Sequence, residues 1–148
     1  MDKWKLPPIE KIYEAFSVIA DNRFEIKDDG RASVTSSAGD KKYNVTWSEV
    51  EKGILKVYSN DNASRWQGYT GYPVIALLMI TGRIQYNKVV IEHFKGIEWN
   101  SLNKAYKNNY ARAVENILDR IGDKVKIEII RSEVNRIYSQ LSELQLFK

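Results

Sequence analysis

The sequence predicts an α+β fold: an N-terminal helix, a four-stranded antiparallel meander, then three or four helices packed on one face of the sheet. Apolar residues recur at helical spacing before residue 20, alternate with polar residues in short runs between residues 24 and 59, and return to helical spacing after residue 72. With 148 residues, 43% of them hydrophobic and 28% charged, the chain has an ordinary globular composition. We therefore expect one domain spanning residues 1–148.

The first helix is expected from about Pro8 to Ala20, where proline suits the first turn. The segment 24–34 then predicts a β-hairpin. A two-residue turn at Asp29-Gly30 would divide the apolar residues between two faces, whereas a three-residue loop pairs Ile26 with Ala32 and Phe24 with Val34. We expect the second register.

Two further strands are expected at residues 41–48 and 53–59, where apolar and polar residues alternate. Short connections make an antiparallel meander the simplest topology for the four strands. The apolar face of this sheet needs a cover, which the later helices can supply.

The later segments predict four helical regions. Residues 72–84 are apolar nearly all the way round, as in a helix at the centre of a core. Residues 87–95 fit a short helix better than a strand. A long helix is expected over 100–121, followed by Gly122, and a last helix through the C-terminus, although residues 124–130 could be a fifth strand.

Residue types argue against several kinds of catalysis. There are no cysteines, which removes disulfides, thiolate nucleophiles and cysteine metal sites, and His93 is the only histidine. No nucleophile motif surrounds a serine, and no glycine motif for binding phosphate occurs. We expect no metal and no cofactor, and a non-catalytic binding or interaction module rather than an enzyme.

The stretch "SNDNASRWQGYTGYP", residues 59–73, is the first candidate binding segment. Its aromatic and polar side chains could meet a ligand beside the start of the following helix, where free N–H groups could help to hold an anion. Alternatively, Trp66 and Tyr72 fold over the sheet and seal the core, with Gly68 and Gly71 supplying positive φ angles. The candidate ligand-binding residues here are Arg65, Trp66, Gln67, Tyr69 and Tyr72.

The second candidate is the basic start of the 100–121 helix, at Lys104, Lys107 and Arg112. Lysines and arginines outnumber acidic residues by 7 to 3 in residues 61–112, while the two signs balance on either side of that segment. Since the helix dipole disfavours cations near a helix N-terminus, these residues could serve a nucleic acid or an acidic protein. A solvated lysine face is the alternative explanation.

A competing hypothesis is a small-molecule-binding protein or enzyme with a pocket between sheet and helices, using Asp61, Arg65, Tyr69 or His93. The longest apolar run is far shorter than the ~20 residues of a membrane helix, so we expect a cytoplasmic location without membrane contact. Leu144, Leu146 and Phe147, near the C-terminus, would be buried either by homodimerisation through the last helix or in the chain's own core.

Overall fold

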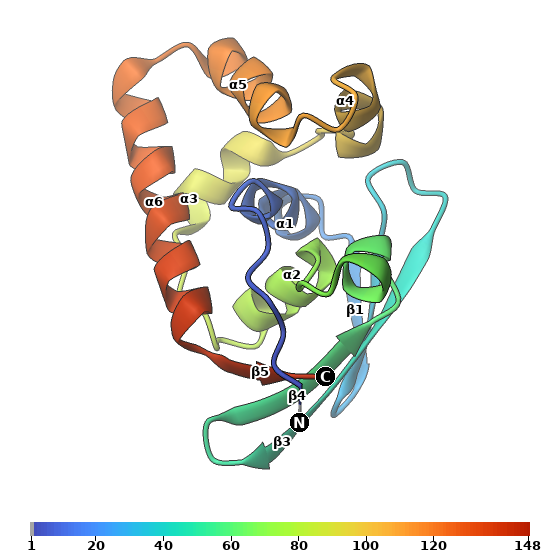
Figure 1. The fold of residues 1–148 in the computed structure, drawn as a ribbon. Coiled ribbons are helices and arrows are strands. Elements are labelled where there is room, and N and C mark those ends of the chain that lie inside the picture. The colour runs from blue at the N-terminus through green and yellow to red at the C-terminus, as the bar shows by residue number, and fades with distance from the viewer. Residues whose placement is uncertain (1) are drawn as a thin grey trace.

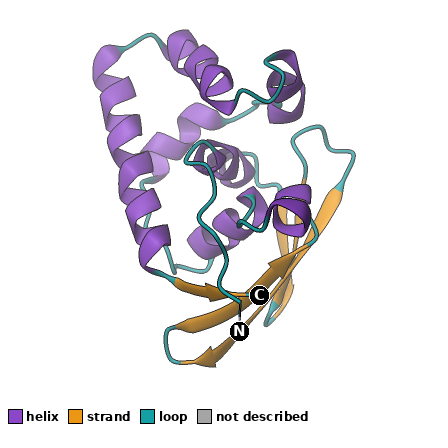
Figure 2. Ribbon diagram, in the orientation of Figure 1, coloured by secondary structure: helices purple, strands orange, loops and turns teal. Residues whose placement is uncertain are grey.

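The computed structural model of the chain describes residues 2–148 and has the predicted α+β architecture. The helices lie on one side of a single twisted sheet (Figures 1 and 2). The strands follow the order β1-β2-β3-β4-β5. The first four form the predicted antiparallel meander, and the fifth adds a parallel strand at its edge.

The start of the chain follows the prediction closely. Helix α1 spans Lys11–Ala20, since residues 8–10 form a turn before it. Strands β1 (Phe24–Asp28) and β2 (Arg31–Thr35) pair in the three-residue-loop register, with Phe24 opposite Val34 and Ile26 opposite Ala32. Gly30 has φ 104°, and a Cβ there would lie 2.8 Å from the Trp47 carbonyl oxygen, so glycine is required in this turn.

Two further strands of the meander and one strand near the C-terminus complete the sheet. Strand β3 (Lys42–Glu51) is longer than predicted and pairs with β4 (Ile54–Ser59). Strand β5 (Gln145–Phe147) lies parallel to β4, so the fifth strand is not formed by residues 124–130. Leu146 is buried in this pairing, as the alternative of burial in the chain's own core predicts, while Leu144 and Phe147 are partly buried.

Helix α2 (Tyr72–Ile80) is the predicted central helix, with residues 73–79 all buried. Helix α1 packs against it, and the short helices α3 (Lys88–Ile91) and η2 (Glu92–Phe94) confirm the preference for helix over strand in this segment. Although α2 is the most apolar helix, no helix within residues 2–148 has both the length and the hydropathy needed to span a bilayer.

The predicted 100–121 helix is wrong as a single element. It is divided into α4 (Trp99–Ala105) and α5 (Tyr110–Ile121), because Lys107 and Asn108 take φ angles of 54° and 63°. The Asn109 side chain then accepts a hydrogen bond from Arg112 N–H and caps α5. The four residues between the helices turn the chain toward α1.

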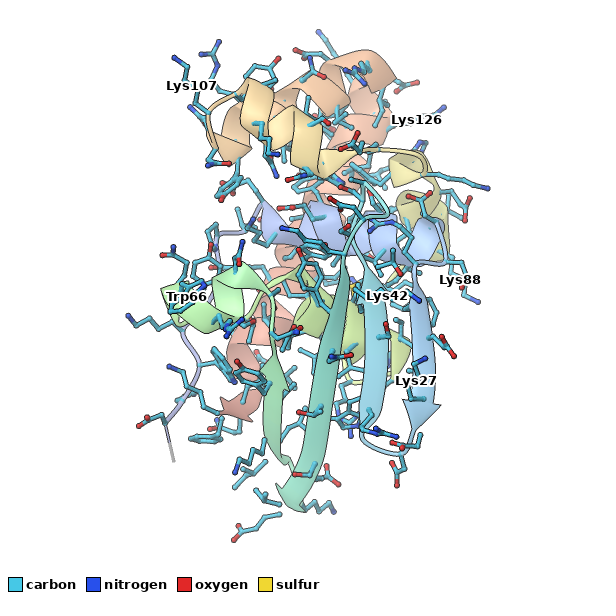
Figure 3. The ribbon with its side chains drawn as sticks, turned by 90° about the vertical axis from the view of Figure 1, so that its right-hand side faces the viewer. Lys27, Lys42, Trp66, Lys88, Lys107 and Lys126 are labelled. Carbon is cyan, nitrogen blue, oxygen red and sulfur yellow. The ribbon has the colours of Figure 1, made fainter. Side chains whose placement is uncertain are left out.

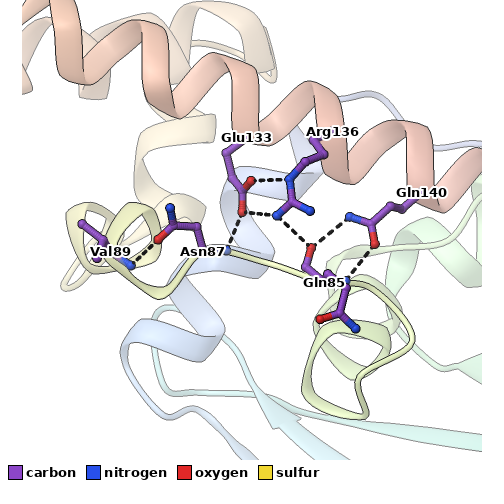
Figure 4. A network of polar contacts seen from close by, with 6 residues as sticks. All are labelled: Gln85, Asn87, Val89, Glu133, Arg136 and Gln140. Atoms are coloured by element: carbon purple, nitrogen blue, oxygen red, sulfur yellow. Dashed lines mark hydrogen bonds and ion pairs between the residues drawn. The ribbon is translucent and has the colours of Figure 1, made fainter.

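Helix α6 (Lys124–Glu143) is held against the segment before α3 by the polar network in Figure 4. The buried Glu133 carboxylate accepts hydrogen bonds from Asn87 N–H and from the Arg136 guanidinium. The Gln140 amide pairs with both backbone groups of Gln85, at 2.8 and 2.9 Å. These bonds fix the part of the helix between Glu133 and Gln140, and β5 follows the helix after Leu144.

Candidate functional site

A pocket of about 690 Å³ opens between the helices and one end of the sheet. Four parts of the chain form it: α1, the β2–β3 turn, the segment that leads from β4 to α2, and the segment around α4 and the start of α5. Its lining residues are Lys11, Glu14, Arg23, Ser36, Ser37, Asp40, Lys41, Tyr43, Asp61, Asn62, Ala63, Trp66, Gln67, Tyr69, Tyr72, Trp99, Asn100, Asn103, Asn108 and Tyr110. Its volume suits a small-molecule ligand.

One wall of the pocket is the 59–73 segment, which contains a single π-helical turn, η1 (Ala63–Gln67). Buried Asp61 organises this turn: its carboxylate accepts hydrogen bonds from Ser64 N–H, at 3.2 Å, and from the Ser64 hydroxyl, at 2.7 Å. The Ser64 oxygen in turn accepts one from Gly71 N–H, at 3.2 Å. Gly68, with φ 75°, ends the turn. Asp61 is therefore used to shape the wall.

The start of α2 has a negative charge of the chain itself close to it. The Asp61 carboxylate lies beside Gly71, the residue that precedes the first turn of the helix. A negative charge is favourable at this end of a helix. The chain's own carboxylate therefore lies close to the position that the sequence interpretation gave to an external anion. Gly71 has φ −77°, so it is not the positive-φ glycine that the sequence suggested.

The floor of the pocket is a buried ion pair on α1. Lys11 Nζ lies 3.0 Å from Glu14 Oε2 and 3.9 Å from the centre of the Tyr110 ring, and Asn103 donates a hydrogen bond to Glu14 Oε1 at 3.4 Å. Burial raises the pKa of the Glu14 carboxyl, although Lys11 and Asn103 favour its charged form. Burial disfavours the Lys11 ammonium, but the Glu14 carboxylate outweighs this and raises the pKa of Lys11. The floor presents a fixed, internally neutralised pair of charges.

Three of the four tyrosines that line the pocket, Tyr43, Tyr69 and Tyr72, lie on the side of the sheet and the 59–73 segment. The rings of Tyr43 and Tyr72 meet edge to face, with centroids 6.2 Å apart and planes at 88°. Burial raises the pKa of Tyr43, Tyr69 and Tyr72, so all three hydroxyls stay protonated to a higher pH than an exposed tyrosine does. Tyr72 also packs against the hydrophobic core. This agrees, for Tyr72, with the alternative in which Trp66 and Tyr72 fold over the sheet and seal the core.

Trp66 does not cover the core, unlike in the alternative in which it seals the core together with Tyr72. It is 72% exposed, at the rim of the pocket, and the Arg65 guanidinium lies 5.4 Å from its ring centre. Figure 3 shows it at one edge of the molecule, on the side away from Lys88 and Lys126. A tryptophan left this open has a face free for stacking.

The pocket brings together half of the sequence-predicted site. Trp66, Gln67, Tyr69 and Tyr72 line it, and Arg65 lies beside Trp66. The basic residues of the second candidate, Lys104, Lys107 and Arg112, are exposed and do not line it. Arg112 instead lies 5.7 Å from the Tyr106 ring centre.

The pocket also brings together only some of the residues named in the competing hypothesis of a small-molecule-binding protein or enzyme. Asp61 and Tyr69 line the pocket, whereas His93, on η2, does not. Within residues 2–148, no group of three or more histidine, aspartate or glutamate side chains is placed to hold a metal ion. The site is therefore best described by its aromatic, amide and paired charged groups.

Sequence reasoning missed the floor of the pocket. Lys11 and Glu14 are three residues apart on a helix, a spacing typical of solvent-exposed ion pairs, and nothing in the local pattern marks them as buried. Asn103 was assigned to a continuous helix. The break between α4 and α5 did have one sequence signal. This was the pair Asn108-Asn109, since asparagine tolerates a left-handed backbone and caps helices.

Comparison with known proteins places the chain in a family. Residues 4–147 match the family described as "Uncharacterised conserved protein UCP014422". The chain belongs to this family. Searches of curated proteins and of solved structures found no significant match. The match covers all four parts of the chain that form the pocket.

Proposed function

We propose that the protein is a binding module whose ligand is a small polar molecule with a planar ring, held in the pocket between the 59–73 segment and α1. The observation that carries the proposal is the convergence of Trp66, Gln67, Tyr69 and Tyr72 with Lys11, Glu14 and Asn103 around one cavity of about 690 Å³. This combines the predicted binding segment with the predicted pocket between sheet and helices. The basic residues Lys104, Lys107 and Arg112 are not part of the proposed site.

The lining supports a ring-bearing ligand without a large net charge. Aromatic side chains offer faces for stacking, and the amides of Gln67, Asn100 and Asn103 offer paired donors and acceptors for the edge of a ring. The charged side chains of the lining balance in number, since Lys11, Arg23 and Lys41 stand against Glu14, Asp40 and Asp61, and Lys11 pairs directly with Glu14. A strongly anionic small molecule would find no excess of free cations inside.

The experiment is a ligand screen by two-dimensional NMR on ¹⁵N-labelled protein, with nucleosides, monosaccharides and aromatic amino acids as probes. A true ligand is expected to shift the backbone signals of residues 61–72 and 99–110 together, because both segments line the pocket. Failure of all three classes to shift these signals at millimolar concentration would count against the proposal.

Two variants localise any binding. Tyr69→Ala removes a ring from the wall, and Asn103→Leu removes the amide beside Glu14 while keeping a similar volume. Each is expected to weaken binding about tenfold or more, since a lost hydrogen bond or ring contact is worth about 1–2 kcal/mol. Asn135→Leu, the same change on an exposed residue of α6, is the matched control and is expected to bind normally.

A further inference from the structure

The two ends of the chain lie against the exposed tryptophan's turn. Lys5 N–H donates a hydrogen bond to the Gly68 carbonyl at 3.1 Å, and Lys148 N–H donates one to the Asp2 carbonyl at 2.8 Å. The Lys148 ammonium lies 3.8 Å from the point that a Cβ would occupy if Gly68 carried a side chain. Figure 1 shows both ends of the chain beside β4. Segments distant in the sequence therefore form one surface with η1.

This surface, which we call the terminal patch, consists of Lys3, Lys5, Arg65, Trp66 and Lys148. All five side chains are exposed. Asp2 is the one acidic residue in the segments 2–6, 65–72 and 145–148 that build it. The patch thus combines four cations with an aromatic face, directly at the rim of the pocket.

The geometry points to single-stranded nucleic acid as the partner of the terminal patch, with its phosphates along Lys5, Arg65 and Lys148 and one base stacked on Trp66. This inference rests on the proposed function, because it makes the ring bound in the pocket a nucleobase of a longer chain. Proteins that bind single strands combine a basic track with aromatic side chains on which bases stack. A polyanion without rings, such as polyglutamate, would use the cations but would supply no ring to stack on the tryptophan.

The polar lining of the pocket fits the same partner. A base turned out of a single strand exposes its hydrogen-bonding edge, and asparagine and glutamine amides can pair with such an edge. Gln67 lies next to Trp66, and Asn62 lines the pocket from the residue before the same turn. Phosphates would remain outside, on the patch, where the free cations are.

The test is fluorescence anisotropy with labelled mixed-sequence 12-nucleotide single-stranded RNA and DNA, at about 50 and 200 mM salt. With three or four phosphate contacts, affinity should fall by roughly 20- to 50-fold between these salt concentrations. Trp66→Ala is expected to weaken binding about tenfold without changing the salt dependence, because it removes stacking only. Lys5→Glu/Lys148→Glu should weaken binding and also reduce the salt dependence.

The matched control is Lys88→Glu/Lys126→Glu, the same double charge reversal on exposed lysines on the far side of the molecule from Trp66 (Figure 3). It is expected to retain most of the affinity. An equal loss in this control would overturn the inference, since binding would then follow net charge alone. Equal affinity for duplex DNA, or for polyglutamate in the place of the oligonucleotide, would also overturn it.

The same measurements separate this inference from the proposed function. If nucleosides shift the pocket signals but the oligonucleotides do not bind, the terminal patch is refuted and the pocket stands. If the oligonucleotides bind with the expected salt dependence and Tyr69→Ala and Asn103→Leu have no effect, the placement of a nucleobase in the pocket is overturned and binding is confined to the terminal patch.

Discussion

The Asp61 carboxylate fills the space that a side chain on Gly71 would need: a Cβ on Gly71 would lie 2.0 Å from Asp61 Oδ2 and 2.7 Å from its Cγ. Gly71 has an ordinary φ angle, so the requirement for glycine is one of space alone. Gly71→Ala must displace a buried carboxylate and its two bonds to Ser64. We expect a loss of roughly 2 kcal/mol or more in unfolding free energy, measured by urea denaturation.

A double-mutant cycle tests this steric explanation. In the Asp61→Ala background the carboxylate is absent, so adding Gly71→Ala should cost clearly less than it does in the wild-type chain. The same cost in both backgrounds would show that the strain at Gly71 has another origin.

The buried pair of Lys11 and Glu14 predicts opposite results for single and double substitutions. Glu14→Leu leaves the Lys11 ammonium buried without its partner and should cost about 3 kcal/mol or more. Lys11→Met/Glu14→Leu replaces both charges with apolar groups of similar size, so its stability should lie within about 1 kcal/mol of the wild type. Thermal and urea unfolding measure both. A double variant as unstable as Glu14→Leu would contradict the role assigned to the pair.

Stability should fall as the pH rises above about 10. Burial raises the pKa of Tyr13 to about 12 and also raises that of Tyr72, while Glu14 raises that of Lys11. The folded state then holds protons that the unfolded chain releases, so these groups contribute stability below pH 10 that is lost as the pH rises through their folded pKa values. Tyr13 alone accounts for roughly 2 kcal/mol between pH 10 and 12. Urea denaturation from pH 8 to 11 should show a shallower decline in Tyr13→Phe than in the wild type.

The connection between α4 and α5 contains a lysine in a left-handed conformation, with φ 54° at Lys107. Lys107→Gly removes the Cβ that disfavours this backbone and should leave stability unchanged or raise it by less than about 1 kcal/mol. Lys107→Val, with a branched Cβ, should lower it by about 1 kcal/mol or more. Lys104→Val, inside α4, is the matched control. Equal effects of valine at the two positions would count against strain at residue 107.

Local sequence patterns were enough for the four-stranded meander and for the central helix, but not for the parallel strand β5. The hairpin register followed from keeping Phe24 and Ile26 on one face, and α2 from a run with no polar side. The break at residues 106–109 was missed because Leu102, Tyr106, Tyr110 and Val114 keep a four-residue spacing through it. The apolar spacing therefore continues through residues 106–109, although the helix is interrupted there.

The candidate site could be predicted only where it is contiguous in sequence. The 59–73 segment was identified because aromatic residues and glycines stand together there. The burial of Lys11 and Glu14 depends on α4 and α5 folding over α1, and the terminal patch depends on the meeting of residues 3–5, 68 and 148. Such contacts are set by the tertiary fold and leave no local pattern.

Strand β4 ends at Ser59, but the strand that covers its outer edge begins only at Gln145, after all the helices that follow the meander. During synthesis, the edge of β4 therefore presents unpaired N–H and C=O groups while the helical layer is still being made. Parallel pairing between such distant segments is slow to form. Variants that delay the docking of α6 should consequently aggregate during expression even where the finished fold loses little stability, because they prolong the time for which this edge can pair with another chain.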